Sequence, residues 1–126
     1  MKRSEHALEQ QKIYFRDLKI RTDLQVKNPD CGCVVSDRIS VDGYEIGIMY
    51  RDFPIPGTMD SGWVFLAGDE DTTYMNTPGN TAAFPLSTIC SYDPAVLPFL
   101  DADYETAFIR EKNGKFAKAG HFFDEE

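Results

Sequence analysis

The segment DSGWVFLAGDEDTTYM, residues 60–75, decides how the rest of the chain is interpreted. It contains the only tryptophan, Trp63, at the start of an apolar run that ends at Ala67. The run is too short for a helix that spans a core, and it is bounded by Gly62 and Gly68. We therefore predict a central strand buried on both faces, in which Trp63 is a structural residue that packs into the core.

Three acidic residues, Asp69, Glu70 and Asp71, follow this strand directly. Carboxylates held by a rigid strand lose little entropy on binding, so the cluster is a candidate partner surface. Tyr74 lies three residues beyond Asp71 and would share one exposed helix face with it, and Asp60 completes the candidate set. The alternative is structural, because a carboxylate such as that of Asp69 could instead cap the short helix expected next.

Composition limits the classes of function. The chain has 126 residues, of which 42% are hydrophobic and 13% aromatic, as expected for one globular domain. Its net charge of −8 argues against nucleic-acid binding, which needs a basic surface, and favours a cationic partner or solubility alone. No membrane-spanning segment occurs, and no apolar signal core follows the basic N-terminus, so we expect a cytoplasmic protein that binds no membrane.

The cysteines indicate neither disulfides nor a metal site. Cys31, Cys33 and Cys90 are odd in number, which favours reduced thiols in a cytoplasmic protein. A zinc site built from them and His121 would have a spacing unlike that of common zinc motifs. We predict buried cysteines on strands, no bound metal and no cofactor.

The first half of the chain predicts a helix followed by a hairpin. Residues 1–30 are expected to form an N-terminal helix and a connector, residues 31–118 a single α+β domain, and residues 119–126 a tail. Strands are predicted over 32–39 and 44–51, joined by a hairpin turn at Asp42-Gly43. Alternation in the second strand would place four apolar side chains on one face. These side chains are Tyr44, Ile46, Ile48 and Tyr50.

The second half combines loops, short helices and a last hairpin. The loop over residues 53–59 contains two prolines and offers Ile55 and Met59 as exposed apolar groups. A helical pattern covers 84–92, after which Asp93 is a candidate N-cap and Pro94 the first residue of another helix. A hairpin over residues 106–118 turns at Asn113-Gly114. The pattern predicts an α+β fold, a mainly antiparallel sheet with an N-terminal helix and short helices on one side.

An ordered set of short motifs runs through the domain. The motifs are Val34–Ile39, Gly47–Arg51, Asp60–Trp63, Gly68–Asp71, Ser91–Pro94, Leu97-Pro98, Leu100-Asp101 and Ala107-Phe108 with Arg110. Together they resemble the thirty-third family of bacterial immunity proteins of polymorphic toxin systems, formerly a domain of unknown function. The resemblance covers about Cys31 to Lys118. It departs from the family pattern in the loop over residues 53–59, which is less acidic than expected, so a partner that contacts this loop would differ too.

The resemblance implies a stoichiometric inhibitor that binds a protein toxin domain, with no catalysis and no catalytic residues. An acidic inhibitor would gain association rate by electrostatic steering toward a basic toxin. Two alternatives stay open: a small regulatory or ligand-binding module, and a hydrolase that uses clustered carboxylates. No HExxH, GxSxG or phosphate-binding loop supports the hydrolase. The carboxylates considered for it are Asp60, Asp69, Glu70, Asp71, Asp93, Asp101 and Asp103.

Overall fold

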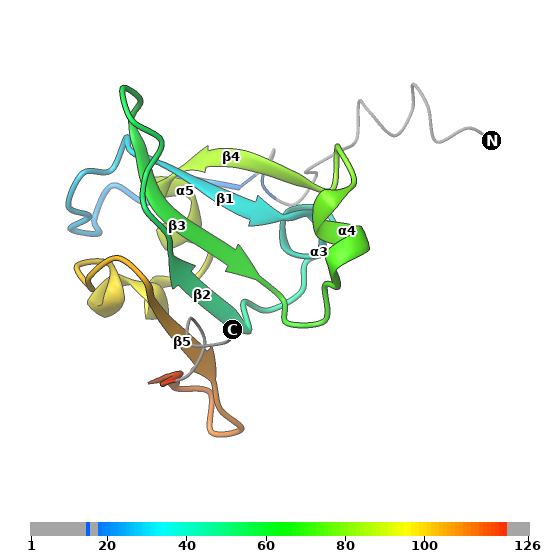
Figure 1. Cartoon of the computed structure of the whole chain (residues 1–126). Coiled ribbons are helices and arrows are strands. Elements are labelled where there is room, and N and C mark those ends of the chain that lie inside the picture. The colour runs from blue at the N-terminus through cyan, green and yellow to red at the C-terminus, as the bar shows by residue number, and fades with distance from the viewer. Residues whose placement is uncertain (1–14, 16–17, 121–126) are drawn as a thin grey trace.

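The computed structural model describes Phe15 and residues 18–120. Most of the predicted N-terminal helix and most of the tail lie outside the described residues. The described part contains one sheet with the strand order β4-β1-β3-β2-β5-β6 (Figure 1). The strands are β1 (Gly32–Ser36), β2 (Ile48–Arg51), β3 (Asp60–Leu66), β4 (Thr81–Pro85), β5 (Thr106–Arg110) and β6 (Phe116–Lys118). The predicted strand of Trp63 is β3, and it lies inside the sheet.

The sheet is mixed, and the fold is broadly α+β. β1 and β3 run parallel, whereas the other neighbouring strands pair antiparallel. The hairpin predicted at Asp42-Gly43 is wrong, because β3 lies between β1 and β2. The Ser36 hydroxyl accepts a hydrogen bond from the Arg38 N–H at 3.1 Å and caps the helix α3 (Asp37–Ser40). The chain therefore leaves the sheet at Ser36 and turns after a helix, not between two paired strands.

The predicted apolar face of β2 is also wrong. Met49 is fully buried and faces the core, so Ile48 and Tyr50 lie on the opposite face, where they are half-buried. Ile46 is buried too, but it precedes the strand. The alternation shifts at Gly47, where a Cβ atom would lie 2.1 Å from the Ala67 carbonyl oxygen. Only glycine fits this approach, and the irregular backbone there reverses the inward and outward positions.

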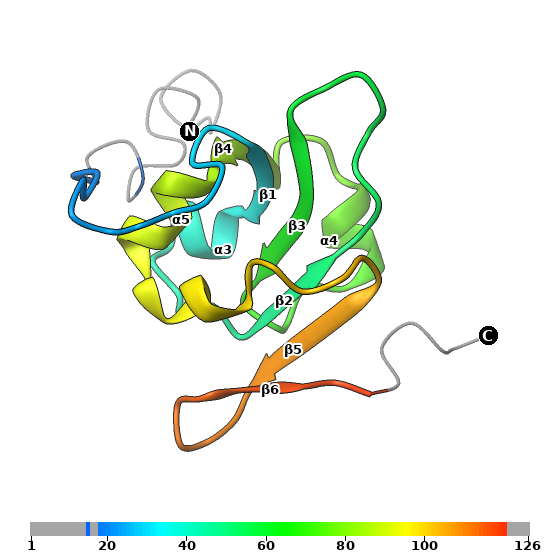
Figure 2. The same cartoon turned by 90° about the vertical axis from the view of Figure 1, so that its left-hand side faces the viewer.

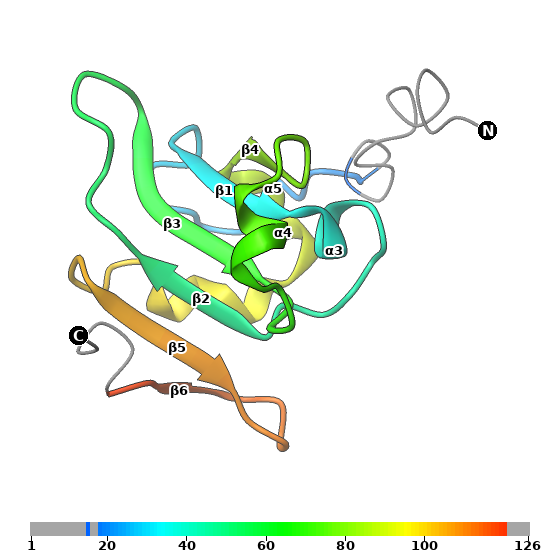
Figure 3. The ribbon, with the colours of Figure 1, turned by 45° about the vertical axis from the view of Figure 1, so that its right-hand side comes forward.

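Helices lie on both sides of the sheet, not on one side as predicted. α3, α5 (Leu86–Tyr92) and the 3₁₀ helix η1 (Pro94–Phe99) cover one face, and α4 (Thr72–Asn76) lies on the other (Figures 2 and 3). The helix predicted from residue 84 begins at Leu86, because residues 81–85 form β4, which the sequence did not predict. β4 pairs with β1 at the edge of the sheet.

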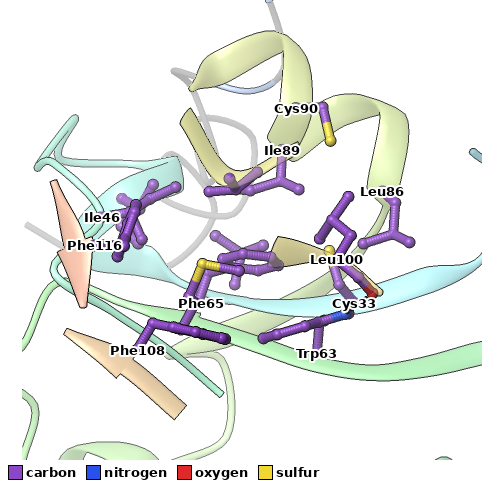
Figure 4. Packing of buried hydrophobic residues seen from close by; sticks show 14 of the residues in the cluster. Cys33, Ile46, Trp63, Phe65, Leu86, Ile89, Cys90, Leu100, Phe108 and Phe116 are labelled. Atoms are coloured by element: carbon purple, nitrogen blue, oxygen red, sulfur yellow. Dashed lines mark hydrogen bonds between the residues drawn. The ribbon is translucent and has the colours of Figure 1, made fainter. Parts of the chain in front are cut away.

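Trp63 is part of the buried core (Figure 4). Its side chain is fully buried, and its ring centroid lies 6.1 Å from that of Phe65 and 6.4 Å from that of Phe108. The indole N–H donates a hydrogen bond to the Leu100 carbonyl at 3.1 Å, which joins β3 to the end of η1. Val64, on the other face of β3, is only half-buried, so the strand is fully buried on one face and not on both.

We expect Trp63→Ala to lower the free energy of unfolding by about 3–5 kcal/mol, because it leaves a large cavity. Trp63→Phe should cost less, since it keeps one aromatic ring in the core, leaves a smaller cavity and loses the hydrogen bond to Leu100. Urea denaturation of the three proteins measures both differences. A Trp63→Ala variant that melts within a couple of degrees of wild type would contradict the central role of this side chain.

Candidate functional site

Asp69, the first acid of the predicted cluster, is paired within the protein. Its carboxylate accepts a hydrogen bond from the Arg38 Nε–H at 3.0 Å, while its side chain stays 59% exposed. The Arg38 guanidinium also lies 4.8 Å from the ring centroid of Tyr74. Arg38 therefore brings Asp69 and Tyr74 together, although the arginine neutralises part of the negative charge that a cationic partner would find.

Glu70 closes the turn between β3 and α4. Its two carboxylate oxygens accept hydrogen bonds from the backbone N–H groups of Ala67 and Gly68, each at 2.8 Å. Partial burial raises the pKa of Glu70, but the hydrogen bonds with Ser36 and with these backbone groups outweigh burial, so the pKa is lowered. Glu70 therefore holds the end of the strand in place.

Asp71 is the N-cap of α4. It accepts a hydrogen bond from the Tyr74 N–H at 2.8 Å. The structural alternative of a helix cap thus applies to Asp71, whereas Asp69 pairs with Arg38. Each of the three acids has an intramolecular partner, and their role in partner binding stays a prediction.

A shallow hollow of about 580 Å³ lies beside this cluster. Its lining includes the apolar side chains Tyr44, Ile48 and Ile109. Of the three acids of the cluster, only Asp69 lines it. No group of three or more His, Cys, Asp or Glu side chains in the described part of the chain could hold a metal ion. Both histidines of the sequence lie outside that part.

Asp60 lies at the opposite end of β3, away from the other candidate residues. β3 has seven residues, which at roughly 3.3 Å per residue separates the two ends by about 20 Å. The Asp60 carboxylate accepts hydrogen bonds from the Ile55 N–H at 3.0 Å and the Gly62 N–H at 3.1 Å. Gly62 has a φ of +87°, and a Cβ there would lie 2.0 Å from the Asp52 carbonyl oxygen. Asp60 and Gly62 together fix the entry of the loop into β3.

The loop between β2 and β3 extends beyond the sheet (Figure 2). Phe53, Ile55 and Met59 on this loop are 59%, 63% and 64% exposed, and Tyr104 beside them is 43% exposed. We call these four side chains the apolar loop patch. The sequence indicated Ile55 and Met59, but it missed Phe53 and Tyr104. Their rings meet with centroids 5.3 Å apart, a contact between distant parts of the chain.

Arg51 connects this patch to the core. Its guanidinium donates hydrogen bonds to the carbonyl of Ser61 at 2.9 Å and to that of Ala102 at 2.8 Å. The same guanidinium lies 4.6 Å from the ring centroid of Tyr104 and 5.8 Å from that of Trp63. Arg51 thus fixes the position of Tyr104 relative to the sheet.

Asp93 forms an ion pair with Arg110, the last residue of β5, and the two side chains are 21% and 10% exposed. Asp93 also caps η1 by accepting a hydrogen bond from the Ala95 N–H at 3.1 Å, and Pro94 is the first residue of that helix. Arg110 donates to the Ile46 carbonyl at 2.8 Å and contacts the Gly114 carbonyl. The predicted cap is therefore part of a larger structural contact that the sequence did not reveal.

The three cysteines are free thiols. Cys33 and Cys90 are buried. Burial raises the pKa of the Cys33 thiol well above its ordinary value, and it raises the pKa of Cys90 to about 11. Both stay protonated at neutral pH, so neither has the thiolate that nucleophilic catalysis needs.

Residues 33–120 match the model of the immunity protein Imm33 domain. The chain belongs to this family. The match confirms the family indicated by the sequence motifs. The matched residues of this Imm33 chain include both ends of β3 and the apolar loop patch. No curated protein and no solved structure matches the chain. No helix in the described residues is long and apolar enough to cross a membrane.

We expect Glu70→Gln to destabilise the protein more at neutral pH than in acid. The pKa of Glu70 is lowered from 4.5 by folding, so its stabilising effect is present above that value and is lost as the pH falls through the folded pKa. Thermal melting at pH 7 and near pH 3 measures the change, with Glu111→Gln, at an exposed position, as the control for lost charge. Equal differences from wild type at both pH values would contradict this role.

We expect Arg110→Met to lower the free energy of unfolding by about 3 kcal/mol, because it leaves a largely buried carboxylate and two carbonyls without their donor. Arg38→Met is the matched control, since its partner Asp69 is well exposed and readily hydrated. Urea denaturation compares the two variants. A similar loss of stability in both variants would show that the Arg110–Asp93 pair contributes no more than the exposed Arg38–Asp69 pair.

Proposed function

We propose that this Imm33 chain binds the toxic domain of a protein toxin in the bacterial cytoplasm and thereby neutralises the toxin. One chain binds one toxin domain, and no catalysis is involved. Membership of the immunity-protein family over residues 33–120 is the observation on which the proposal rests. A stoichiometric inhibitor needs a rigid surface that matches its target and no reactive group of its own. The packed core around Trp63 supplies the rigid support for such a surface.

The charge of the chain favours a basic target. With a net charge of −8, the protein attracts a cationic toxin domain over a distance of about one Debye length, which is about 8 Å at physiological salt. This attraction raises the association rate more than it raises affinity. Asp69, with its exposed carboxylate, remains a candidate contact at one end of β3, and Glu70, Asp71, Tyr74 and Asp60 remain predicted partner residues.

The proposal is tested with a toxin domain sought among the genes that neighbour the gene for this chain. Expression of that domain alone should stop growth of the host, and co-expression of this chain should restore it. Isothermal titration of the purified proteins should then show saturation at one chain per toxin domain. Protection that persists at a small fraction of one equivalent would indicate catalytic inactivation and contradict the proposal. Absence of both binding and protection would contradict it as well.

A further inference from the structure

The apolar loop patch, Phe53, Ile55, Met59 and Tyr104, has an acidic border and a rigid backbone. We propose that this patch is the docking surface for the toxin domain, and that it fits an apolar pocket bordered by lysine and arginine side chains. The inference rests on the proposed function, because the partner is the same toxin domain. It goes further by naming the surface and the chemistry of the partner.

Exposure sets this surface apart. Seven large hydrophobic side chains in the described residues are exposed, and the patch contains four of them, including the two most exposed. Burying side chains of this size in a partner is a main source of favourable binding free energy. Of the remaining three, Tyr44 and Ile109 line the hollow near Asp69, and Ile20 stands apart from both. A concentration of exposed apolar groups in one patch marks an interaction site more often than scattered ones do.

The loop is held in one shape before any partner arrives. The Thr58 hydroxyl donates to the Ile55 carbonyl at 2.7 Å and accepts from the Asp60 N–H at 3.2 Å. Asp60 in turn accepts from the Ile55 N–H, and the prolines on either side of Ile55, Pro54 and Pro56, restrict the backbone. Because the loop is ordered already, binding loses less conformational entropy. This assigns Asp60 a positioning role behind the patch.

The aromatic part of the patch is fixed in the same way. The Tyr104 ring contacts both the Arg51 guanidinium and the Phe53 ring. Arg51 is itself fixed by two backbone carbonyls. Aromatic side chains that lose little freedom on binding are typical anchors of protein interfaces.

Charge argues for a basic border on the partner. Carboxylates lie on both segments that frame the patch, and they are Asp52, Asp60, Asp101, Asp103 and Glu105. Two cations lie on or near these segments, Arg51 and Lys27, and Lys27 pairs with Asp101 at 3.8 Å, so five carboxylates stand against two cations. The border therefore presents net negative charge to a partner. An apolar pocket with a basic border complements both features.

The decisive variant combines Ile55→Asp with Met59→Asp. Both side chains are almost two-thirds exposed, so the fold should survive, which thermal melting checks. Ile109→Asp is the matched control, because Ile109 is exposed apolar surface at the hollow. Asp69→Asn with Asp71→Asn tests the acidic cluster, since asparagine still caps a helix. We expect the patch variant to weaken toxin binding about 100-fold and Ile109→Asp to bind nearly as wild type does. The Asp69 and Asp71 variant should mainly lose association rate, because it weakens electrostatic steering.

The acidic border is tested by Asp103→Asn with Glu105→Gln. This variant should associate with the toxin domain more slowly than wild type and depend less on salt, with its dissociation rate almost unchanged. Surface plasmon resonance at two salt concentrations measures both rates. An unchanged association rate would remove the basic border from the proposal.

Three other results would overturn the docking surface. A folded patch variant that binds the toxin domain as wild type does would show that the loop is not the interface. Loss of binding only in the Asp69 and Asp71 variant would place the interface at the other end of β3. If wild type sediments as a dimer and the patch variant sediments as a monomer, the patch binds a second copy of this chain. Failure of wild type to bind at all would contradict the proposed function itself.

Discussion

The buried indole of Trp63 is the contact on which the other elements depend. It packs against aromatic rings from its own strand and from β5, and its N–H group ties the sheet to the end of η1. The Arg51 guanidinium approaches it at 5.8 Å and extends the same series of contacts to Tyr104 and then to Phe53. The surface proposed for docking is thus continuous with the core, so its geometry follows from the packing of one side chain.

Local signals predicted those elements whose cause is local. The strand at Trp63, the cap at Asp93 and the hairpin at Asn113-Gly114 each depend on a few neighbouring residues, and the structure contains all three. The hairpin predicted at Asp42-Gly43 was wrong because the same two residue types that join paired strands also follow the end of a helix. The Ser36 cap and the position of β3 between β1 and β2 decide that a helix, and not a paired strand, precedes this turn. Neither can be inferred from the residues of the turn.

The remaining differences have tertiary causes. The segment over residues 81–85 contains two alanines and a proline, residues with little preference for strands, and it becomes β4 because β1 offers an unpaired edge. The parallel pairing of β1 with β3 joins residues that are far apart in the sequence. No period or turn motif within a short window encodes such pairings.

The candidate site shows the same limit. A run of three acids predicted a partner surface, but a strand that ends next to a short helix leaves backbone N–H groups that need acceptors. Glu70 and Asp71 meet this need, and the composition of the run could not show it. Conversely, Phe53 and Tyr104 are 51 positions apart, and only folding brings their rings together.

The uneven burial of the thiols has a practical consequence. Cys33 and Cys90 are enclosed in the core, whereas Cys31 is half-buried and lines a small cavity with Arg51, Asp60 and Tyr104. Alkylating reagents that act on the folded protein therefore have one favoured target among the three thiols. A fluorophore attached there sits behind the loop that we propose as the docking surface. The native sequence already provides a labelling position from which events at that loop can be followed by changes in emission.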